Sequence, residues 1–566
     1  MPLIRPLPRR VTRGFSIVTL VAWIVSMGVL VNRAYLQASS NLAMDLARYG
    51  SAAEWRGVYY RGEKVGFTVS QTVPTADGFE LQEHGRLQMS LLGATTAATI
   101  QTKAQVDRAF VLRSFEFSLD PGTGPVAISG RVDGPHMRLS IKTSSGTQTE
   151  ERELTDVPVL GLNLSRRLAS QGLKAGSRQE WMIFDPATLT NQPAVVEVGK
   201  REIVNVDAGA PIRLGRREVL RMANRSIPAF RVDMTFAGLR TTSWVTDTGE
   251  VVREESPTGL MSVRESPETA RRMAIGDRIQ GDLLEAAAVV PLRTATSRRL
   301  DDPRDVRRLE LQLDGIDLAS PDLQGAGQSV QGDVLEIVDA RSLRASPADV
   351  DLQRYLEPEP LIESDDPAIR AEARAAIDGV TGARAQAERL TRRVNAMLDK
   401  KPTVSLPSAR DVLRTRVGDC NEHTALYVAM ARAAGIPSRI AVGLVYTRGA
   451  FYYHAWPEVF VDETRSPSTG SGRSRGVWLP VDPTFNQFPA DATHVRLARG
   501  GLDRQAAILP LVGKLKMTIR DVDLGPNARS VLVGRQPADL APLAVPIPRR
   551  NASGCCSCWS NPSRLR

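Results

Sequence analysis

Cysteine and aromatic side chains are scarce in this 566-residue chain. Three of its four cysteines, Cys555, Cys556 and Cys558, lie close to the C-terminus, so only Cys420 belongs to the body of the chain. A single thiol cannot form a disulfide framework. Aromatic residues make up 5% of the sequence, and its arginines are scattered rather than gathered in one basic stripe. The net charge of +10 therefore does not indicate a nucleic-acid partner.

Recognisable metal-binding patterns are also missing. No acidic loop has the ligand spacing of a calcium site, and no paired Cys/His motif repeats as in a zinc domain. We therefore expect no metal and no cofactor. The remaining composition, 42% hydrophobic and 24% charged, is that of a globular protein and excludes disorder of the whole chain. A chain of this length exceeds one hydrophobic core, so we expect two or three domains.

Residues 15–31 form an uncharged, mostly apolar run at the lower length limit of a transmembrane helix. Arg5, Arg9, Arg10 and Arg13 precede it, which by the positive-inside rule places the N-terminus in the cytoplasm. The pattern predicts a single-pass anchor in the inner membrane through residues 15–31, with the rest of the chain extracytoplasmic or periplasmic.

Two alternatives to this anchor remain. A cleaved signal peptide is one, since residues 38–40 offer a small-x-small site, although they lie far from the apolar run. A buried core helix is the other, but it leaves the arginine-rich flank unexplained.

Short alternating runs separated by Gly, Pro, Asp and Ser predict antiparallel strands over residues 45–265. Residues 266–362 form a connecting region, with one strand pattern at 309–313. Strong helix formers at 368–377 and 383–398 begin a more helical domain, which we place at 363–500. Residues 1–40 then hold the arginine-rich start and the anchor, and residues 501–566 form a C-terminal extension. The fold class predicted is α+β.

Cys420 stands where a helix is expected to begin. The run 424–434 has one apolar side, and Gly435 and Pro437 supply a stop signal after it. A thiol at a helix N-terminus faces unpaired N–H groups and the positive end of the macrodipole, which lower its pKa. This position favours a reactive thiol over a buried structural cysteine.

Two β-branched runs at 438–446 and 451–461 follow, and His454 lies on the second. The third run, 477–481, ends at Asp482. If the third strand pairs with the second, His454 and Asp482 come from neighbouring strands about 5 Å apart. A base and the carboxylate that orients it need this arrangement. We therefore predict Cys420 as nucleophile, His454 as base and Asp482 as the orienting residue.

Other residues are weaker candidates for the catalytic roles, and a zinc site is a weaker alternative. Glu458 shares the face of His454 but lies roughly 13 Å along the strand, so it is poorly placed to orient the imidazole. His423 is at i+3 from Cys420 and contends for the role of base, yet no carboxylate from another element is expected beside it. A zinc site of Cys420, His423, His454 and Asp482 would have a single soft ligand. Asp419 and Glu422 fit capping or solvated positions better than catalytic ones.

Three separated segments resemble the bacterial transglutaminase-like superfamily: GDCNEHTALYVAMARAAGIPSRIAVGLVY, HAWPEVF and WLPVDPTFNQFPADATHVRL. The resemblance covers about residues 410–497, in the order Cys, His, Asp. A weaker resemblance, TTSWVTDTGEVVREESP, lies in the β-rich region. The resemblance implies a papain-like α+β domain. Pro457 departs from the pattern and suggests an edge strand or a bulge.

The resemblance implies that Cys420 attacks an amide or ester carbonyl, that His454 moves the proton, and that Asp482 holds the imidazole. The backbone N–H of Cys420 is one expected oxyanion donor. Asn421 and Trp456 are weak candidates for the second, and Trp456 fits packing beside the strand better. The acyl acceptor, water or an amine, stays open.

The functional hypothesis is a membrane-anchored cysteine acyltransferase or peptidase acting on exported proteins or cell-wall peptides. The alternative is a non-catalytic binding or assembly module that keeps this fold as a scaffold. The cysteine-containing tail follows a proline-rich stretch and is expected to be unstructured, rather than a metal or disulfide site.

Overall fold

The computed structural model describes residues 53–525, apart from residues 92–93, 123, 207–211, 214–218, 221–224, 273–284, 286, 295–299, 301, 320, 348–350, 403–405, 407, 463–474, 501–507, 509–510 and 512. The chain divides into two compact units, Met1–Gly525 and Pro526–Arg566, and every described residue belongs to the first. The predictions for residues 15–31 and for the tail cysteines Cys555, Cys556 and Cys558 lie outside the described residues.

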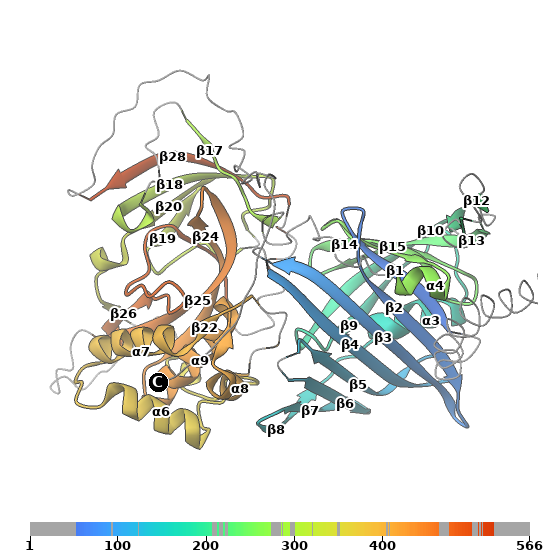
Figure 1. Ribbon diagram of the computed structural model, residues 1–566, viewed down its shortest axis with the longest axis horizontal. Coiled ribbons are helices and arrows are strands. Elements are labelled where there is room, and N and C mark those ends of the chain that lie inside the picture. The colour runs from blue at the N-terminus through green and yellow to red at the C-terminus, as the bar shows by residue number, and fades with distance from the viewer. Residues whose placement is uncertain are drawn as a thin grey trace, which may run out of the picture. The chain divides into compact units, whose positions relative to one another are not determined.

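The first half of the described chain forms one antiparallel sheet of fourteen strands, drawn blue to green in Figure 1. Its order is β8-β7-β6-β5-β4-β3-β2-β1-β16-β15-β14-β13-β10-β9, so β1 and β16 join its two halves. The strands are β1 Glu54–Tyr60, β2 Glu63–Pro74, β3 Gly78–Leu91, β4 Ala94–Asp107, β5 Leu112–Asp120, β6 Val126–Asp133, β7 His136–Thr143, β8 Gly146–Glu153, β9 Arg178–Asp185, β10 Thr190–Val206, β13 Arg225–Phe236, β14 Leu239–Val245, β15 Val251–Glu255 and β16 Leu260–Arg264.

Alternating side chains explain these strands. In β7, Met137, Leu139 and Ile141 are buried while Arg138 between them is exposed, because successive side chains point to opposite faces. Helix α3, Gly161–Ser170, packs its buried leucines into the apolar core of β9, β10, β13 and β14. The short elements beside this sheet are β11 Ile212–Arg213, β12 Val219–Leu220 and α4 Pro267–Arg271.

A five-stranded sheet of order β17-β28-β18-β20-β19 follows. Its strands are β17 Leu292–Arg293, β18 Val306–Asp314, β19 Gln328–Gln331, β20 Val334–Val338 and β28 Lys516–Leu524, and the short helices η2 Pro303–Asp305, η3 Ala340–Ser342 and η4 Gln353–Tyr355 lie nearby in the chain. Strand β28 pairs antiparallel with β18, so a segment predicted as C-terminal extension joins a sheet begun in the predicted connecting region. The predicted domain boundaries stay predictions.

The third sheet carries the candidate site and has the order β21-β26-β25-β24-β27. Its strands are β21 Ser346–Pro347, β24 Ser438–Thr447, β25 Ala450–Asp462, β26 Arg475–Pro480 and β27 His494–Arg499. Helices α6 Pro367–Ile377, α7 Ala383–Met397, α8 Ala409–Thr415 and α9 Cys420–Ala433 gather beside it, as Figure 1 shows, and the short strands β22 Asp399–Lys400 and β23 Val417–Gly418 lead into α9. Helix α9 is buried along most of its length between the other helices and strands β24 and β25.

Pro457 does not mark an edge or a bulge, contrary to the prediction. Strand β25 is the centre of the sheet, and its pairing with β24 runs without a register shift past Ile440 and Pro457. The carbonyl of Pro457 accepts a hydrogen bond from the N–H of Val481, just beyond the end of β26. The nitrogen of Pro457 faces the same side as its carbonyl, toward the segment after β26, where the β25–β26 ladder has ended. Its missing N–H therefore removes no pair from either ladder of β25.

The predicted α+β class is wrong for this protein. The structure is mostly β, with 51% of the described residues in strands and 19% in helices, because the large antiparallel sheet outweighs the helices around α9. Among the described residues, no helix is both long and apolar enough to cross a membrane. The described residues therefore do not support the predicted fold with a transmembrane helix or the predicted single-pass location in the inner membrane. Residues 15–31, on which both rested, lie outside the described part of the chain.

Candidate active site

Cys420 is the first residue of helix α9, as the stop and start signals predicted. The side chain of Asp419 caps the helix by accepting the N–H of Asn421 at 2.9 Å, and Glu422 reaches back to the N–H of Asp419 at 2.8 Å. This reciprocal capping box fixes the direction of the first turn. Asp419 and Glu422 thus have the capping roles expected of them, and the half-buried Cys420 keeps part of its surface exposed.

The electrostatics of the thiol differ from the prediction. Burial raises the pKa of Cys420 well above its usual value, and the carboxylate of Asp419 raises it further. The backbone N–H of Ala455 acts in the opposite direction and lowers this pKa. Burial and the Asp419 carboxylate oppose the lowered thiol pKa that the helix N-terminus alone predicts.

His454 and Asp482 contact each other directly. Strand β25 pairs with β26, and Nε2 of His454 lies 2.8 Å from Oδ2 of Asp482. Both side chains are buried. Because Nε2 faces the carboxylate, Nδ1 is the ring nitrogen available to accept a proton from a thiol. Cys420 is linked to the same strand, because its sulfur accepts a hydrogen bond from the backbone N–H of Ala455, the residue after His454.

The carboxylate of Asp482 has four hydrogen-bond donors. Oδ1 accepts the backbone N–H groups of Thr484 at 2.7 Å and Phe485 at 3.0 Å. Oδ2 contacts Nε2 of His454 and also Nε2 of His494, the latter at 3.1 Å. Burial alone raises the pKa of Asp482, but the two histidines outweigh burial and hold this pKa well below its usual range. Asp482 is therefore ionised.

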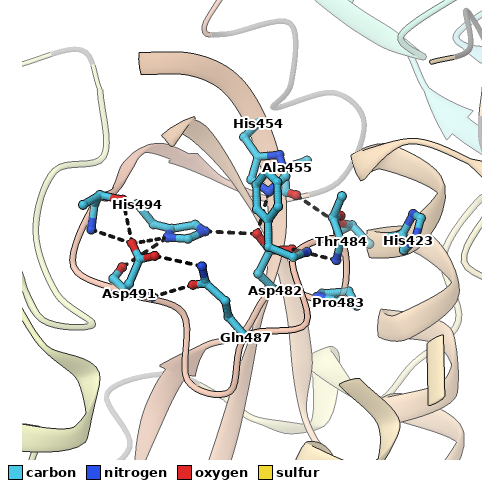
Figure 2. A network of polar contacts seen from close by, with 12 residues as sticks. His423, His454, Ala455, Asp482, Pro483, Thr484, Gln487, Asp491 and His494 are labelled. Carbon is cyan, nitrogen blue, oxygen red and sulfur yellow. Dashed lines mark hydrogen bonds and ion pairs between the residues drawn. The ribbon is translucent and has the colours of Figure 1, made fainter. Parts of the chain in front are cut away.

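Sequence reasoning missed His494, Asp491 and Gln487. Figure 2 shows the rings of His454 and His494 approaching Asp482 from different directions, with Asp491 behind His494. Gln487 donates to Oδ2 of Asp491 at 2.8 Å, and its backbone pairs with that of Asp482. One signal in the sequence could have pointed to His494. It is a histidine twelve residues after Asp482, in a chain that has only five histidines.

The alternative base, His423, is buried on α9 and lies apart from Asp482 in Figure 2. Its Nδ1 lies 2.6 Å from the carbonyl oxygen of Asp419, so this nitrogen carries the proton. Burial lowers the pKa of His423. Glu458, the other rejected partner, is occupied by Arg439 at 2.7 Å and Arg496 at 3.0 Å.

Trp456 is 1% exposed and stacks beside His454, with ring centroids 6.1 Å apart. It therefore packs beside the strand, as the preferred interpretation had it. Its Nε1 has no hydrogen-bond partner among the described residues. The second oxyanion donor, for which Asn421 and Trp456 were the candidates, stays a prediction.

Within the described part of the chain, one group of side chains has metal-ligand spacing: His454, Asp482 and His494, whose ligand atoms lie within 4.8 Å of one another. Cys420 and His423 do not join this group, so the zinc site considered from the sequence does not form. Two ligands of a tetrahedral zinc ion, each about 2.0–2.1 Å from the metal, would lie roughly 3.3 Å apart. The spacings from Asp482 Oδ2 are 2.8 and 3.1 Å, which are hydrogen-bond distances. We interpret the group as a hydrogen-bonded network.

Residues 370–483 match the transglutaminase-like superfamily. The chain therefore contains a transglutaminase-like domain there. The match includes Cys420, His454 and Asp482 and stops before Asp491 and His494. No curated protein matches the chain at a significant level.

Several solved structures are distantly similar. A candidate cysteine protease from Cytophaga hutchinsonii is 17% identical, with 40% of this chain and 78% of that chain covered and a TM-score of 0.23. A beta-barrel-like protein of a domain of unknown function from Brucella abortus is 12% identical, with 38% and 95% covered and a TM-score of 0.29. A candidate protease from Parabacteroides distasonis is 11% identical, with 66% and 67% covered and a TM-score of 0.17.

Proposed function

We propose that this protein is a cysteine acyltransferase or peptidase of transglutaminase-like type, with Cys420 as nucleophile, His454 as base and Asp482 as the residue that orients the base. The observation that carries the proposal is the buried 2.8 Å contact between His454 and Asp482, together with the hydrogen bond to Cys420 from the backbone of Ala455, the residue after His454. A nucleophile, a base and an orienting carboxylate from three separate elements form the arrangement that covalent acyl transfer requires.

The chemistry starts from a neutral thiol. His454 Nδ1 takes the thiol proton as Sγ of Cys420 bonds to the carbonyl carbon of an amide. The tetrahedral intermediate then expels the amine, which receives the proton from His454, and a thioester remains on Cys420. Water or a second amine attacks the thioester, again giving a proton to His454, and the thiol is restored when that proton returns to sulfur.

Asp482 contributes throughout this cycle. Its ionised carboxylate keeps the proton of the neutral imidazole on Nε2 and leaves Nδ1 free for the thiol. It also stabilises the imidazolium that forms when His454 accepts the thiol proton. The acyl acceptor decides between hydrolysis and transamidation, and the substrate we propose is a protein or peptide amide.

The test is alkylation of Cys420 by iodoacetamide in the full-length protein at pH 7.5, followed by peptide mass analysis. Because burial and Asp419 disfavour the thiolate, rapid alkylation requires His454 as base. We expect His454→Ala to slow the reaction roughly 100-fold or more. His136→Ala, at an exposed position in β7, is the matched control and should change nothing.

Equal alkylation rates in the His454→Ala and wild-type proteins would contradict the proposal. The scaffold alternative would then gain support, since a retained fold without base assistance cannot run acyl transfer. If the base is confirmed, casein and a fluorescent primary amine distinguish the two reactions. Incorporation of the amine indicates transamidation, and released peptides indicate hydrolysis, and both should disappear in Cys420→Ala.

A further inference from the structure

His494 lies between two carboxylates. Its Nε2 is 3.1 Å from Oδ2 of Asp482, and its Nδ1 is 3.1 Å from the carbonyl oxygen and 3.3 Å from Oδ1 of Asp491. Figure 2 shows this ring bridging the two acidic residues. His494 is 5% exposed, so water does not compete for these contacts.

The partners of His494 determine its protonation state. Carbonyl and carboxylate oxygens only accept hydrogen bonds, so each ring nitrogen has to carry a hydrogen, which makes the ring a cation. Asp491 is itself held in place, since its Oδ1 accepts both the N–H and the hydroxyl of Thr493, at 3.0 and 2.6 Å. Burial alone lowers the pKa of His494, but the hydrogen bonds and charges of Asp482 and Asp491 raise it to about 10.

We propose that His494 is a positioning residue, a permanent imidazolium that fixes the carboxylate of Asp482 and offsets part of that carboxylate's charge beside His454. The two rings share one oxygen, and their centroids are 5.9 Å apart. A positive charge at this distance disfavours a second positive charge on His454. The proton that His454 takes from the thiol is therefore held loosely enough to be returned to the leaving amine.

Other charged groups surround the two rings, and none replaces His494. Helix α9 contributes Cys420, Asp419, Glu422 and the neutral His423. Lys400 of β22 acts on His423 and lowers its pKa. On the strands, Glu458 of β25 pairs with Arg496 of β27 at 3.0 Å and with Arg439 of β24 at 2.7 Å. In the described part of the network, the cation that contacts Asp482 opposite His454 is His494.

The role of His494 in tuning a base rests on the proposed function, whereas its charge can be measured without any substrate. We would record the ring nitrogens of the full-length protein labelled with 15N-histidine as pH is raised. The chain has five histidines, so single His→Gln variants assign every signal. We expect His494 to be doubly protonated at pH 8, where an ordinary histidine is neutral. A neutral tautomer at pH 8 would overturn the proposal.

His494→Gln tests the effect on His454. Glutamine keeps an N–H donor toward Asp482 and removes the charge, so the pH profile of Cys420 alkylation should shift by roughly one pH unit or more. A purely structural role would leave this profile in place, and that outcome would also overturn the proposal. If His494→Gln does not fold, Asp491→Asn serves instead. It retains an acceptor and removes a counter-ion, so the midpoint of His494 should fall by about one unit or more, and an unchanged midpoint contradicts the proposal.

These outcomes separate the inference from the proposed function. A doubly protonated His494 together with alkylation of Cys420 that does not depend on His454 would refute the enzyme and leave the charge assignment standing. Alkylation that depends on His454 together with a neutral His494 would refute the charge assignment and leave the proposed enzyme standing.

Discussion

His454 and His494 donate to the same oxygen atom, Oδ2 of Asp482, at 2.8 and 3.1 Å. A carboxylate between two imidazoles cannot rotate without losing both contacts, and its other oxygen is tied to the backbone of Thr484 and Phe485. The orientation of His454 is therefore fixed by the segment after β26 and by β27 together.

Asp482→Asn should leave the fold intact and remove the assistance of the base. Asparagine keeps the size of the side chain but not the charge that holds His454 and His494. We expect alkylation of Cys420 by iodoacetamide at pH 7.5 to slow by about 100-fold or more, to the level of His454→Ala. Wild-type alkylation in a folded Asp482→Asn protein, verified by circular dichroism, would exclude the orienting role.

The alkylation of Cys420 should require unusually alkaline pH once His454 is removed. In His454→Ala, burial and the charge of Asp419 raise the thiol pKa, so the midpoint should lie above the ~8.5 of a free thiol. Adding Asp419→Asn removes one negative charge while keeping a good N-cap, so this midpoint should fall. Glu151→Gln, at a position in β8 that is 69% exposed, is the control and should leave the midpoint unchanged.

Thr424 ties the cysteine helix to the histidine strand. Its hydroxyl donates to the carbonyl oxygen of Ala455 at 3.1 Å, and Thr424 is 1% exposed. Thr424→Val removes the hydrogen bond at constant shape, so we expect a loss of about 0.5–1.5 kcal/mol in unfolding free energy and slower alkylation of Cys420. Thr424→Ser keeps the hydroxyl and should preserve the alkylation rate. Slowing in the serine variant alone would contradict this role.

Glu458 should make unfolding sensitive to acid. Burial alone raises the pKa of Glu458, but Arg496 and Arg439 outweigh burial and lower it to about 2. Because the folded-state pKa is depressed, the stabilisation is complete above the unfolded pKa near 4.5 and is lost as pH falls toward about 2. Urea unfolding between these pH values should show the loss.

Glu458→Gln should abolish that pH dependence and cost roughly 3–5 kcal/mol at pH 7, since it leaves two buried guanidinium groups without their carboxylate. Removing the exposed pair of Arg138 and Glu151 by Glu151→Gln should cost at most about 1 kcal/mol. Equal costs for the two variants would show that Glu458 is not the partner of these arginines.

The sequence was sufficient for the local features of the site. Gly435 and Pro437 after a helical run indicated the extent of α9, and the structure begins this helix at Cys420. The alternation at 477–481 indicated a strand that ends before Asp482, and β26 pairs with β25 as assumed. Such features depend on residues that are close in the chain, and propensity and periodicity report them directly.

The fold class and the thiol pKa required the tertiary structure. The helices around α9 gave an α+β pattern locally, but the fourteen strands of the large sheet decide the composition of the whole. The helix N-terminus alone predicted a lowered pKa for Cys420. Burial and nearby carboxylates reverse it, and neither can be read from position in a helix.

By itself, the sequence determined on which local elements Cys420, His454 and Asp482 lie, and it predicted these three as the catalytic residues. Only the tertiary structure decided that His494 joins them. It comes from β27, which pairs with β24 and not with β25, and a hydrogen bond across the sheet leaves no periodic trace in the chain. Charge interactions and hydrogen bonds depend on distance in space, and local sequence carries no measure of the distance between β27 and Asp482.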